Sequence, residues 1–282
     1  MRSVERMIQT SFDIISIGYE LLDGRVLNTN AKWLAEQISS LGGKVCRIVV
    51  VGDQVEEISS VIRDSFRRKI DWVITTGGLG PTYDDITLQG VAKAANRKLV
   101  LNRRALEMIK KKYLELFEKG LIDSPELTPH RIKMAMLPRG AEPLENEVGS
   151  APGVLLKSGK TRIVCLPGVP SELENIFTKR VKPLLEKSMK KICTADRWLL
   201  IIGVPESTLA PKIDEVKTKF PQVYVKSHPK REEEKSIINL YMRALAKTPS
   251  KCHKTLNDVE KIIIRLVEEL GGTISRPEGA PT

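Results

Sequence analysis

The amino-acid sequence predicts an α/β protein with a mostly parallel sheet, followed by a small α+β domain. In the first two thirds of the chain, short β-branched runs alternate with stretches of helical spacing, which is the pattern of right-handed βαβ units. After Lys191 the order changes to β-α-β-β-α. The length of 282 residues, with 41% hydrophobic residues, is sufficient for two domains with packed cores.

In the first domain, each element follows from the spacing of its apolar residues and from its flanking residues. Asn30 is predicted to cap the first helix, and Gly42 to end it. The expected strands are 13–18, 44–51, 71–75 and 161–166. The expected helices are 31–38, 55–69, one through 91–95, an insertion at 103–137 interrupted by two X-Pro pairs, and 171–187.

The second domain is expected to contain strands at 197–202, 222–227 and 237–244 and helices at 206–220 and 256–270. We therefore set the predicted domain boundaries at 11–190 and 191–275.

Charge, cysteines and hydropathy limit the class of protein. The chain has 46 Lys and Arg against 35 Asp and Glu, a net charge of +11. Because basic and acidic residues are interleaved, a solvated surface is favoured over a nucleic-acid site, which stays an alternative. The cysteines form no CxxC pair, no apolar run approaches the ~20 residues of a spanning helix, and residues 1–11 resemble no export signal. We expect a cytoplasmic protein without a membrane partner.

The four strands of the first domain each end in an unusual loop. These loops are Gly18-Tyr19-Glu20, Gly52-Asp53, Gly77-Gly78-Leu79-Gly80 and Pro167-Gly168-Val169-Pro170. In a parallel sheet the carboxyl ends of the strands meet at one edge, which is where ligands bind. The sequence therefore predicts a binding site made from these loops.

The third loop predicts an anion site. Gly77, Gly78 and Gly80 allow backbone N–H groups to approach a ligand, and the following helix N-terminus favours negative charge. Thr76 and Thr82 can add hydroxyl hydrogen bonds. No Gly-Lys-Ser/Thr follows, so the loop is not a Walker motif. A phosphate group is the ligand that we expect here.

Asp84 and Asp85 follow this loop and are predicted to bind Mg²⁺ or another divalent metal beside the phosphate. The alternative is that Asp85 caps the next helix. Asp53 and Glu20 either reach the same site or close local turns, and the two interpretations are evenly balanced.

Three further features have simple structural alternatives. Gly168 and Ser171 open a helix that could bind a second anion, although Ser171 could instead be a plain N-cap. Asn28 and Asn30 fit turn and cap positions better than ligand positions. The segment 146–153 either forms a wall of the pocket or is an ordinary connection.

Taken together, these motifs resemble the molybdopterin-binding-like domain of the CinA (competence/damage-inducible protein) family, related to MogA and MoaB of molybdenum cofactor synthesis. The resemblance covers about 13–187. Its motifs are Gly18-Tyr19-Glu20-Leu21-Leu22, Asn28-Thr29-Asn30, Thr76 to Thr82, Asp84-Asp85-Ile86-Thr87, Asn146 with Gly149 to Gly153, and Leu166 to Glu172.

The resemblance implies a three-layer α/β/α domain in which the Gly-Gly loop, the acidic pair and Asp53 surround a pterin or nucleotide phosphate and a metal. CinA-type members are associated with metal-dependent ADP-ribose pyrophosphatase activity and the MogA side with molybdopterin adenylylation, and homodimers or homotrimers are common. The family usually has Asp or Asn where this chain has Tyr19. The second domain resembles a KH-like module without a GxxG loop, so nucleic acid is not an expected partner.

The function expected on this basis is the metal-dependent hydrolysis of a nucleotide pyrophosphate such as ADP-ribose, with Asp53, Asp84 and Asp85 as catalytic residues. The alternative is a molybdopterin- or nucleotide-binding protein of molybdenum cofactor biosynthesis without turnover. A nucleic-acid module built on the second domain is a third hypothesis.

Overall fold

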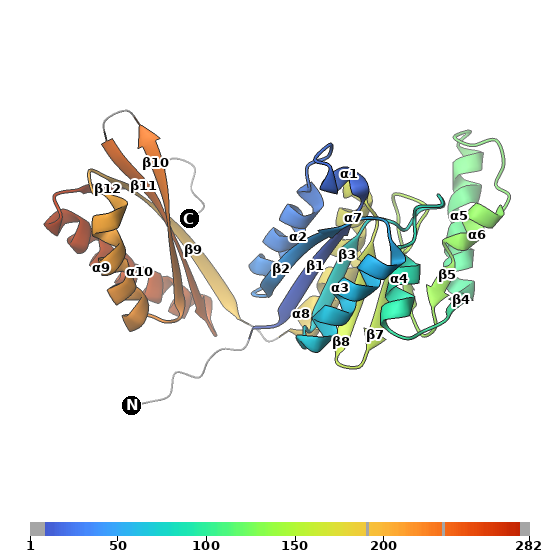
Figure 1. Cartoon of the computed structure of the whole chain (residues 1–282), viewed down its shortest axis with the longest axis horizontal. Helices are drawn as coiled ribbons and strands as arrows, with labels where there is room; N and C mark the ends of the chain where they lie inside the picture. The colour runs from blue at the N-terminus through green and yellow to red at the C-terminus, as the bar shows by residue number, and fades with distance from the viewer. Residues whose placement is uncertain (1–8, 190–191, 233–234, 277–282) are drawn as a thin grey trace. The chain divides into compact units, whose positions relative to one another are not determined.

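The computed structural model describes residues 9–189, 192–232 and 235–276. It divides into two compact units, Met1–Lys190 and Lys191–Thr282, which are described separately (Figure 1). No helix in the described part of the chain is long and apolar enough to cross a membrane. Residues 1–8, which include most of the segment examined for an export signal, lie outside the described residues.

The first unit contains a six-stranded sheet in the order β2-β1-β3-β8-β7-β6. The first four of these strands are parallel, and β7 and β6 extend the edge in antiparallel pairing. The prediction of a mostly parallel sheet is therefore confirmed. The strands are β1 Ser11–Ile17, β2 Lys44–Val51, β3 Trp72–Thr76, β8 Thr161–Leu166, β7 Gly153–Ser158 and β6 Glu142–Leu144.

Helices cover both faces of this sheet, so the unit has the three layers that the resemblance implies (Figure 1). On one face, Phe12 and Ile14 of β1 share a core with α2 Thr29–Ser40 and with α7 Pro170–Ile176. On the other face, alternate residues of the same strands pack on α3 Val55–Arg67, α4 Thr87–Ala94 and α5 Arg103–Glu118. The period of two along buried strands produces this division.

Three local predictions need correction. Helix α2 begins at Thr29 and is capped by Asn28, whose Oδ1 accepts from the Ala31 N–H at 3.2 Å, so Asn30 is not the cap. The expected helix at 171–187 is α7, a π-helical segment η1 Phe177–Val181 and α8 Lys182–Ser188. The expected helical insertion contains α5 and α6 Pro129–Lys133, but it also includes β5 Met136–Pro138, which pairs with β4 Leu99–Leu101.

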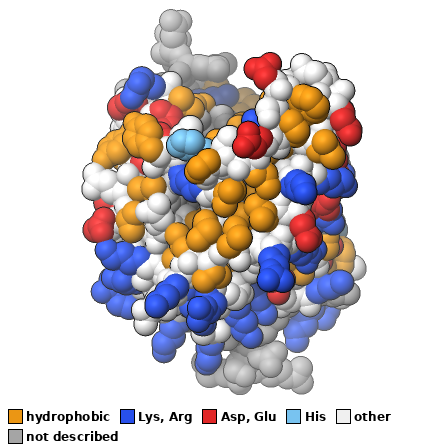
Figure 2. Space-filling model, turned by 90° about the vertical axis from the view of Figure 1, so that its right-hand side faces the viewer, with side chains coloured by type: hydrophobic (Ala, Val, Ile, Leu, Met, Phe, Trp, Pro, Cys, Tyr) orange, Lys and Arg blue, Asp and Glu red, His pale blue; other side chains and the backbone are white. Residues whose placement is uncertain are grey.

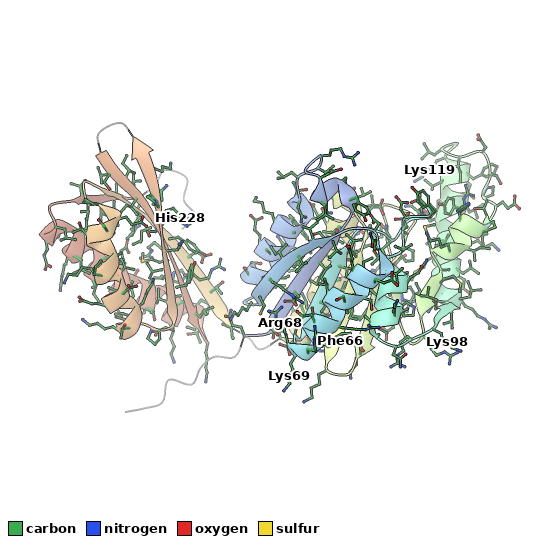
Figure 3. All side chains as sticks on the ribbon, in the orientation of Figure 1. Phe66, Arg68, Lys69, Lys98, Lys119 and His228 are labelled. Carbon is green, nitrogen blue, oxygen red and sulfur yellow. The ribbon has the colours of Figure 1, made fainter. Side chains whose placement is uncertain are left out.

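A charged network lies near the amino end of β1. The Asp13 side chain is fully buried and accepts hydrogen bonds from Ser65 Oγ at 2.7 Å, Arg47 Nε at 2.8 Å and Arg68 Nη1 at 3.1 Å. Arg68, labelled in Figure 3, directly follows α3. Arg47 also donates to Asp64 at 2.6 Å. This network links two strands to α3, away from the carboxyl ends of the strands.

The second unit is an antiparallel sheet with the order β10-β11-β9-β12, and α9 and α10 pack on one face of it. The element order β-α-β-β-α-β is that of a split βαβ, ferredoxin-like arrangement. Its elements are β9 Cys193–Ile202, α9 Glu206–Lys219, β10 Val223–Glu232, β11 Lys235–Ala246, α10 Pro249–Glu269 and β12 Thr273–Ser275. The short strand β12 was not predicted from the sequence.

Candidate functional site

A cavity of about 480 Å³ opens at the carboxyl ends of β1, β2, β3 and β8. The four strand-end loops do meet there, as the parallel sheet predicts. Nine of the predicted site residues line it: Glu20, Asp53, Thr76, Gly77, Gly78, Gly80, Asp84, Asp85 and Gly168. Thr82 and Ser171 are not among the lining residues.

The glycine loop has a conformation that other residues would strain. Gly77 has φ +102° and Gly78 has φ +66°. Thr87 fixes the loop, because its Oγ1 donates to the Gly77 carbonyl at 2.8 Å and its N–H donates to the Gly78 carbonyl at 3.2 Å. The Gly77 N–H donates to the Leu166 carbonyl at 3.0 Å. Gly77 therefore shapes the loop, and within the described residues the Gly78 and Gly80 amides are left without a partner.

Gly77→Ala should destabilise the chain more than Gly140→Ala. Both glycines have positive φ, which costs about 1–2 kcal/mol for another residue. A Cβ at Gly77 would lie 2.3 Å from the Ile17 carbonyl oxygen, whereas a Cβ at Gly140 would meet nothing within 4 Å. We expect a further 1–3 kcal/mol, roughly, for Gly77→Ala. Urea unfolding of the two variants checks this, and equal midpoints would show that crowding at Ile17 has no effect.

The two carboxylates after the loop are held by Thr82. Its Oγ1 lies 2.5 Å from Asp84 Oδ1 and 2.5 Å from Asp85 Oδ2, and its N–H donates to Asp85 Oδ2 at 2.8 Å. The hydrogen bond from Thr82 lowers the pKa of Asp84. The residue before α4 is Ile86, with no side-chain cap, so the alternative that Asp85 caps this helix is wrong. Thr82 therefore positions acids that face the cavity.

Asp53 is fixed at the end of β2 by the backbone of the first loop. The Tyr19 N–H donates to Asp53 Oδ2 at 3.0 Å. The Tyr19 ring packs against Gly52, and its hydroxyl accepts from Gln54 Nε2 at 2.6 Å. Tyr19 is not among the cavity-lining residues. The unusual aromatic residue thus packs on the end of β2 and leaves the cavity to Glu20 and Asp53.

The acidic groups around the cavity influence one another. Partial burial raises the pKa of Asp53, and repulsion from Glu20, Asp84 and Asp85 adds to this, against the lowering effect of the Tyr19 N–H. A cation or a proton at this position would relieve the repulsion. The cavity lining therefore contains acidic side chains and, among the described residues, no Lys or Arg beside the loop with open amides, and Lys133, which is outside the lining, also lowers the pKa of Asp84.

Asp53→Asn should raise the melting temperature of the ligand-free chain at neutral pH. Because folding raises the pKa of Asp53, its stabilising contribution is complete below the ordinary value of 3.8 and is lost as the pH rises through the folded-state pKa. Above that pKa the ionised carboxylate is a cost that asparagine removes. The melting temperatures of the two proteins should converge towards acid pH. A difference in melting temperature that does not change with pH would contradict a raised pKa of Asp53.

The acidic residues of the cavity suit a metal ion that binds together with a phosphorylated ligand. The described residues contain no group of three or more His, Cys, Asp or Glu side chains placed to hold an ion. Mg²⁺ is commonly held by one or two carboxylates together with substrate phosphates and water. Asp84 and Asp85, joined through Thr82, fit this requirement beside the open Gly78 and Gly80 amides.

Asn30 is a site residue, although its sequence position favoured a cap. Its Nδ2 donates to Thr76 Oγ1 at 3.0 Å and to the Gly168 carbonyl at 2.8 Å, and Thr76 Oγ1 donates to the Pro167 carbonyl at 3.1 Å. Asn30 also lines the cavity. It therefore ties the end of β3 to the loop after β8, and the Thr76 hydroxyl serves this link.

The segment 146–153 forms a wall of the cavity, which decides between its two interpretations. Ser150, Ala151 and Glu172 line the cavity, and Asn146 Nδ2 donates to the Ala151 carbonyl at 2.8 Å and to Glu172 Oε2 at 2.6 Å. Glu172 was missed as a site residue, although its place in the first turn of α7 was visible in sequence. Ser171 is exposed, and the cap of α7 is Val169, so Ser171 is not the N-cap.

Comparisons with known proteins agree with the fold. The family model described as "Probable molybdopterin binding domain" matches residues 13–187. A relative from Aeropyrum pernix is 47% identical over 268 residues, covering 94% of this chain and 96% of its own. Another from Pyrobaculum calidifontis is 44% identical over 256 residues, covering 90% and 95%. The solved structure of CinA from Thermoplasma acidophilum, described as of unknown function, is 39% identical, covers 62% of this chain and 98% of its own, and superposes with a TM-score of 0.56.

Proposed function

Because this chain belongs to the family with a CinA-like molybdopterin-binding domain, we propose that it is a metal-dependent hydrolase of a nucleotide pyrophosphate such as ADP-ribose. The observation that supports this proposal most is the geometry of one cavity. Asp53, Asp84 and Asp85 surround it beside the open amides of the glycine loop.

In this proposal the loop binds the pyrophosphate. The N–H groups of Gly78 and Gly80 donate to phosphate oxygens, and the N-terminus of α4 favours their negative charge. Asp84 and Asp85 would hold the Mg²⁺, which neutralises phosphate charge when bound. Without a cation, these carboxylates would repel the phosphates.

Asp53 then acts on water. Its raised pKa and its fixed Oδ2 suit it to accept a proton from a water molecule. The water oxygen bonds to one phosphorus while the bridging P–O bond breaks, which gives AMP and a ribose phosphate. The Tyr19 N–H keeps the Asp53 carboxylate in one orientation during this step.

The test is chromatographic detection of AMP when the chain is incubated with ADP-ribose and a series of divalent metals. Metal-dependent release of AMP with ribose phosphate in equal amounts supports the proposal. No AMP with any of Mg²⁺, Mn²⁺, Co²⁺ or Ni²⁺ rejects it.

The second candidate is a molybdopterin- or nucleotide-binding protein of molybdenum cofactor biosynthesis that does not turn its ligand over. The description of the matching family favours it. A rise in melting temperature with molybdopterin or AMP, without product from ADP-ribose, would select this candidate.

Two further features complete the proposal. Figure 2 shows apolar side chains gathered on one face of the protein, and exposed large apolar residues occur on and beside α5: Leu101, Leu114, Phe117 and Leu121. We propose that they support a homo-oligomer, to be checked by light scattering.

All four cysteines are free thiols, which agrees with the proposed cytoplasmic location.

A further inference from the structure

The sheet of the second unit has an open face. Along β9 the side chains of Ala195, Leu199 and Ile201 are buried in the core that α9 and α10 cover, so Asp196 and Trp198 lie on the opposite side. The same alternation holds on β10 and β11. No described helix of the second unit packs on that opposite side.

Four aromatic rings adjoin one another across three strands on this face. The Trp198 and Tyr241 rings, paired in register between β9 and β11, have centroids 4.8 Å apart. Tyr224 lies 6.3 Å from Tyr241, and His228, labelled in Figure 3, lies 5.7 Å from Trp198. Tyr224 is 58% exposed. We call these four residues the aromatic strip.

Basic side chains border the aromatic strip. Lys226 is opposite Tyr241 in the register of β10 and β11, and Lys230 lies farther along the same face of β10. Neither lysine forms an ion pair with a described residue. Asp196 is the single acid among the side chains described on this face, and Arg243 neutralises it through contacts of 2.6 and 2.9 Å.

We propose that the aromatic strip binds single-stranded nucleic acid. Every base presents a flat face that can stack on an aromatic ring, and free lysines at the border can contact the phosphates. A four-stranded sheet that stacks two or three bases on aromatic side chains is an established mode of RNA recognition. The absence of a GxxG loop, which argued against nucleic acid at the sequence level, does not bear on binding by a sheet face.

The experiment measures fluorescence anisotropy of labelled 12-nucleotide RNA and DNA strands, and of an RNA duplex, with the full chain at low salt. We expect both single strands to bind, and the duplex to bind at least about tenfold more weakly because its bases are already stacked. Tighter binding of RNA than of DNA would indicate a further contact to the 2′-hydroxyl, and this result would also support the proposal. Absence of single-strand binding at about 100 µM protein would overturn it.

Variants then locate the site. Tyr224→Ala should weaken single-strand binding about 5- to 100-fold, and Tyr224→Phe, which keeps the ring, should not. Lys226→Ala with Lys230→Ala should reduce the slope of log affinity against log salt by about 1.4. The matched pair Lys254→Ala with Lys261→Ala, on the exposed side of α10, should leave the slope unchanged.

Other outcomes reject the aromatic strip as the site. Affinity that Tyr224→Ala and the β10 lysine changes leave unaltered would place the nucleic acid elsewhere. Loss of self-association in Tyr224→Ala, without strand binding by the parent protein, would make this face a protein interface. AMP release from ADP-ribose should be equal in Tyr224→Ala and the parent, so this proposal and the proposed hydrolase can fail independently.

Discussion

Replacing Asp85 with asparagine should lower the turnover of ADP-ribose by about 100-fold or more. Asparagine has the same shape, and its Oδ1 can still accept from the Thr82 N–H, which bonds Asp85 at 2.8 Å in the structure. The loop is therefore expected to keep its conformation while the charge that would hold the cation is lost. Turnover at saturating substrate, measured over a range of Mg²⁺ concentrations, checks this.

The concentration of Mg²⁺ that gives half-maximal turnover should rise in this variant if Asp85 is a metal ligand. Asp123→Asn is the matched control, since Asp123 is exposed and is not among the residues lining the cavity. Its turnover should equal that of the parent. An Asp85→Asn protein that hydrolyses ADP-ribose at the parent rate would remove Asp85 from the mechanism.

The convergence of acids and glycines could be predicted because its signals are local. A β-branched run followed directly by Gly-Asp or Gly-Gly is visible within ten residues, and the parallel topology brings such ends together. Asp53, Asp84 and Asp85 all reached the same cavity for that reason. The parallel pairing also places these three side chains at the same edge of the sheet, because the carboxyl ends of parallel strands lie together.

Contacts that depend on distant pairing could not be predicted in this way. The Gly77 N–H is bonded because β3 pairs with β8, far away in sequence, and this pairing removes one amide from the expected phosphate site. Asn30 satisfies the local pattern of a helix cap as well as Asn28 does. Only the folded position of the loop after β8 shows that Asn30 links this loop to the end of β3 instead.

Asp13→Ala should destabilise the first unit by about 1.5–3 kcal/mol. Asp13 is fully buried between Arg47 and Arg68, and its removal leaves both guanidinium groups without their shared carboxylate. For a unit of this size, about 2–4 °C of melting temperature is lost per kcal/mol, so we expect a fall of roughly 3–12 °C. Thermal unfolding followed by circular dichroism measures this.

Burial, more than the charge itself, should determine the size of this effect. Asp64 accepts from the same Arg47 at 2.6 Å, but its side chain is 33% exposed, and water can replace it. Asp64→Ala should therefore cost less than about 1 kcal/mol. If Asp13→Ala and Asp64→Ala instead unfold at the same temperature, water solvates the arginines when Asp13 is removed, and the burial of Asp13 does not determine the effect. A triple change of Asp13, Arg47 and Arg68 to apolar residues should recover part of the loss, because the two partly buried guanidinium groups that lose Asp13 are then absent as well.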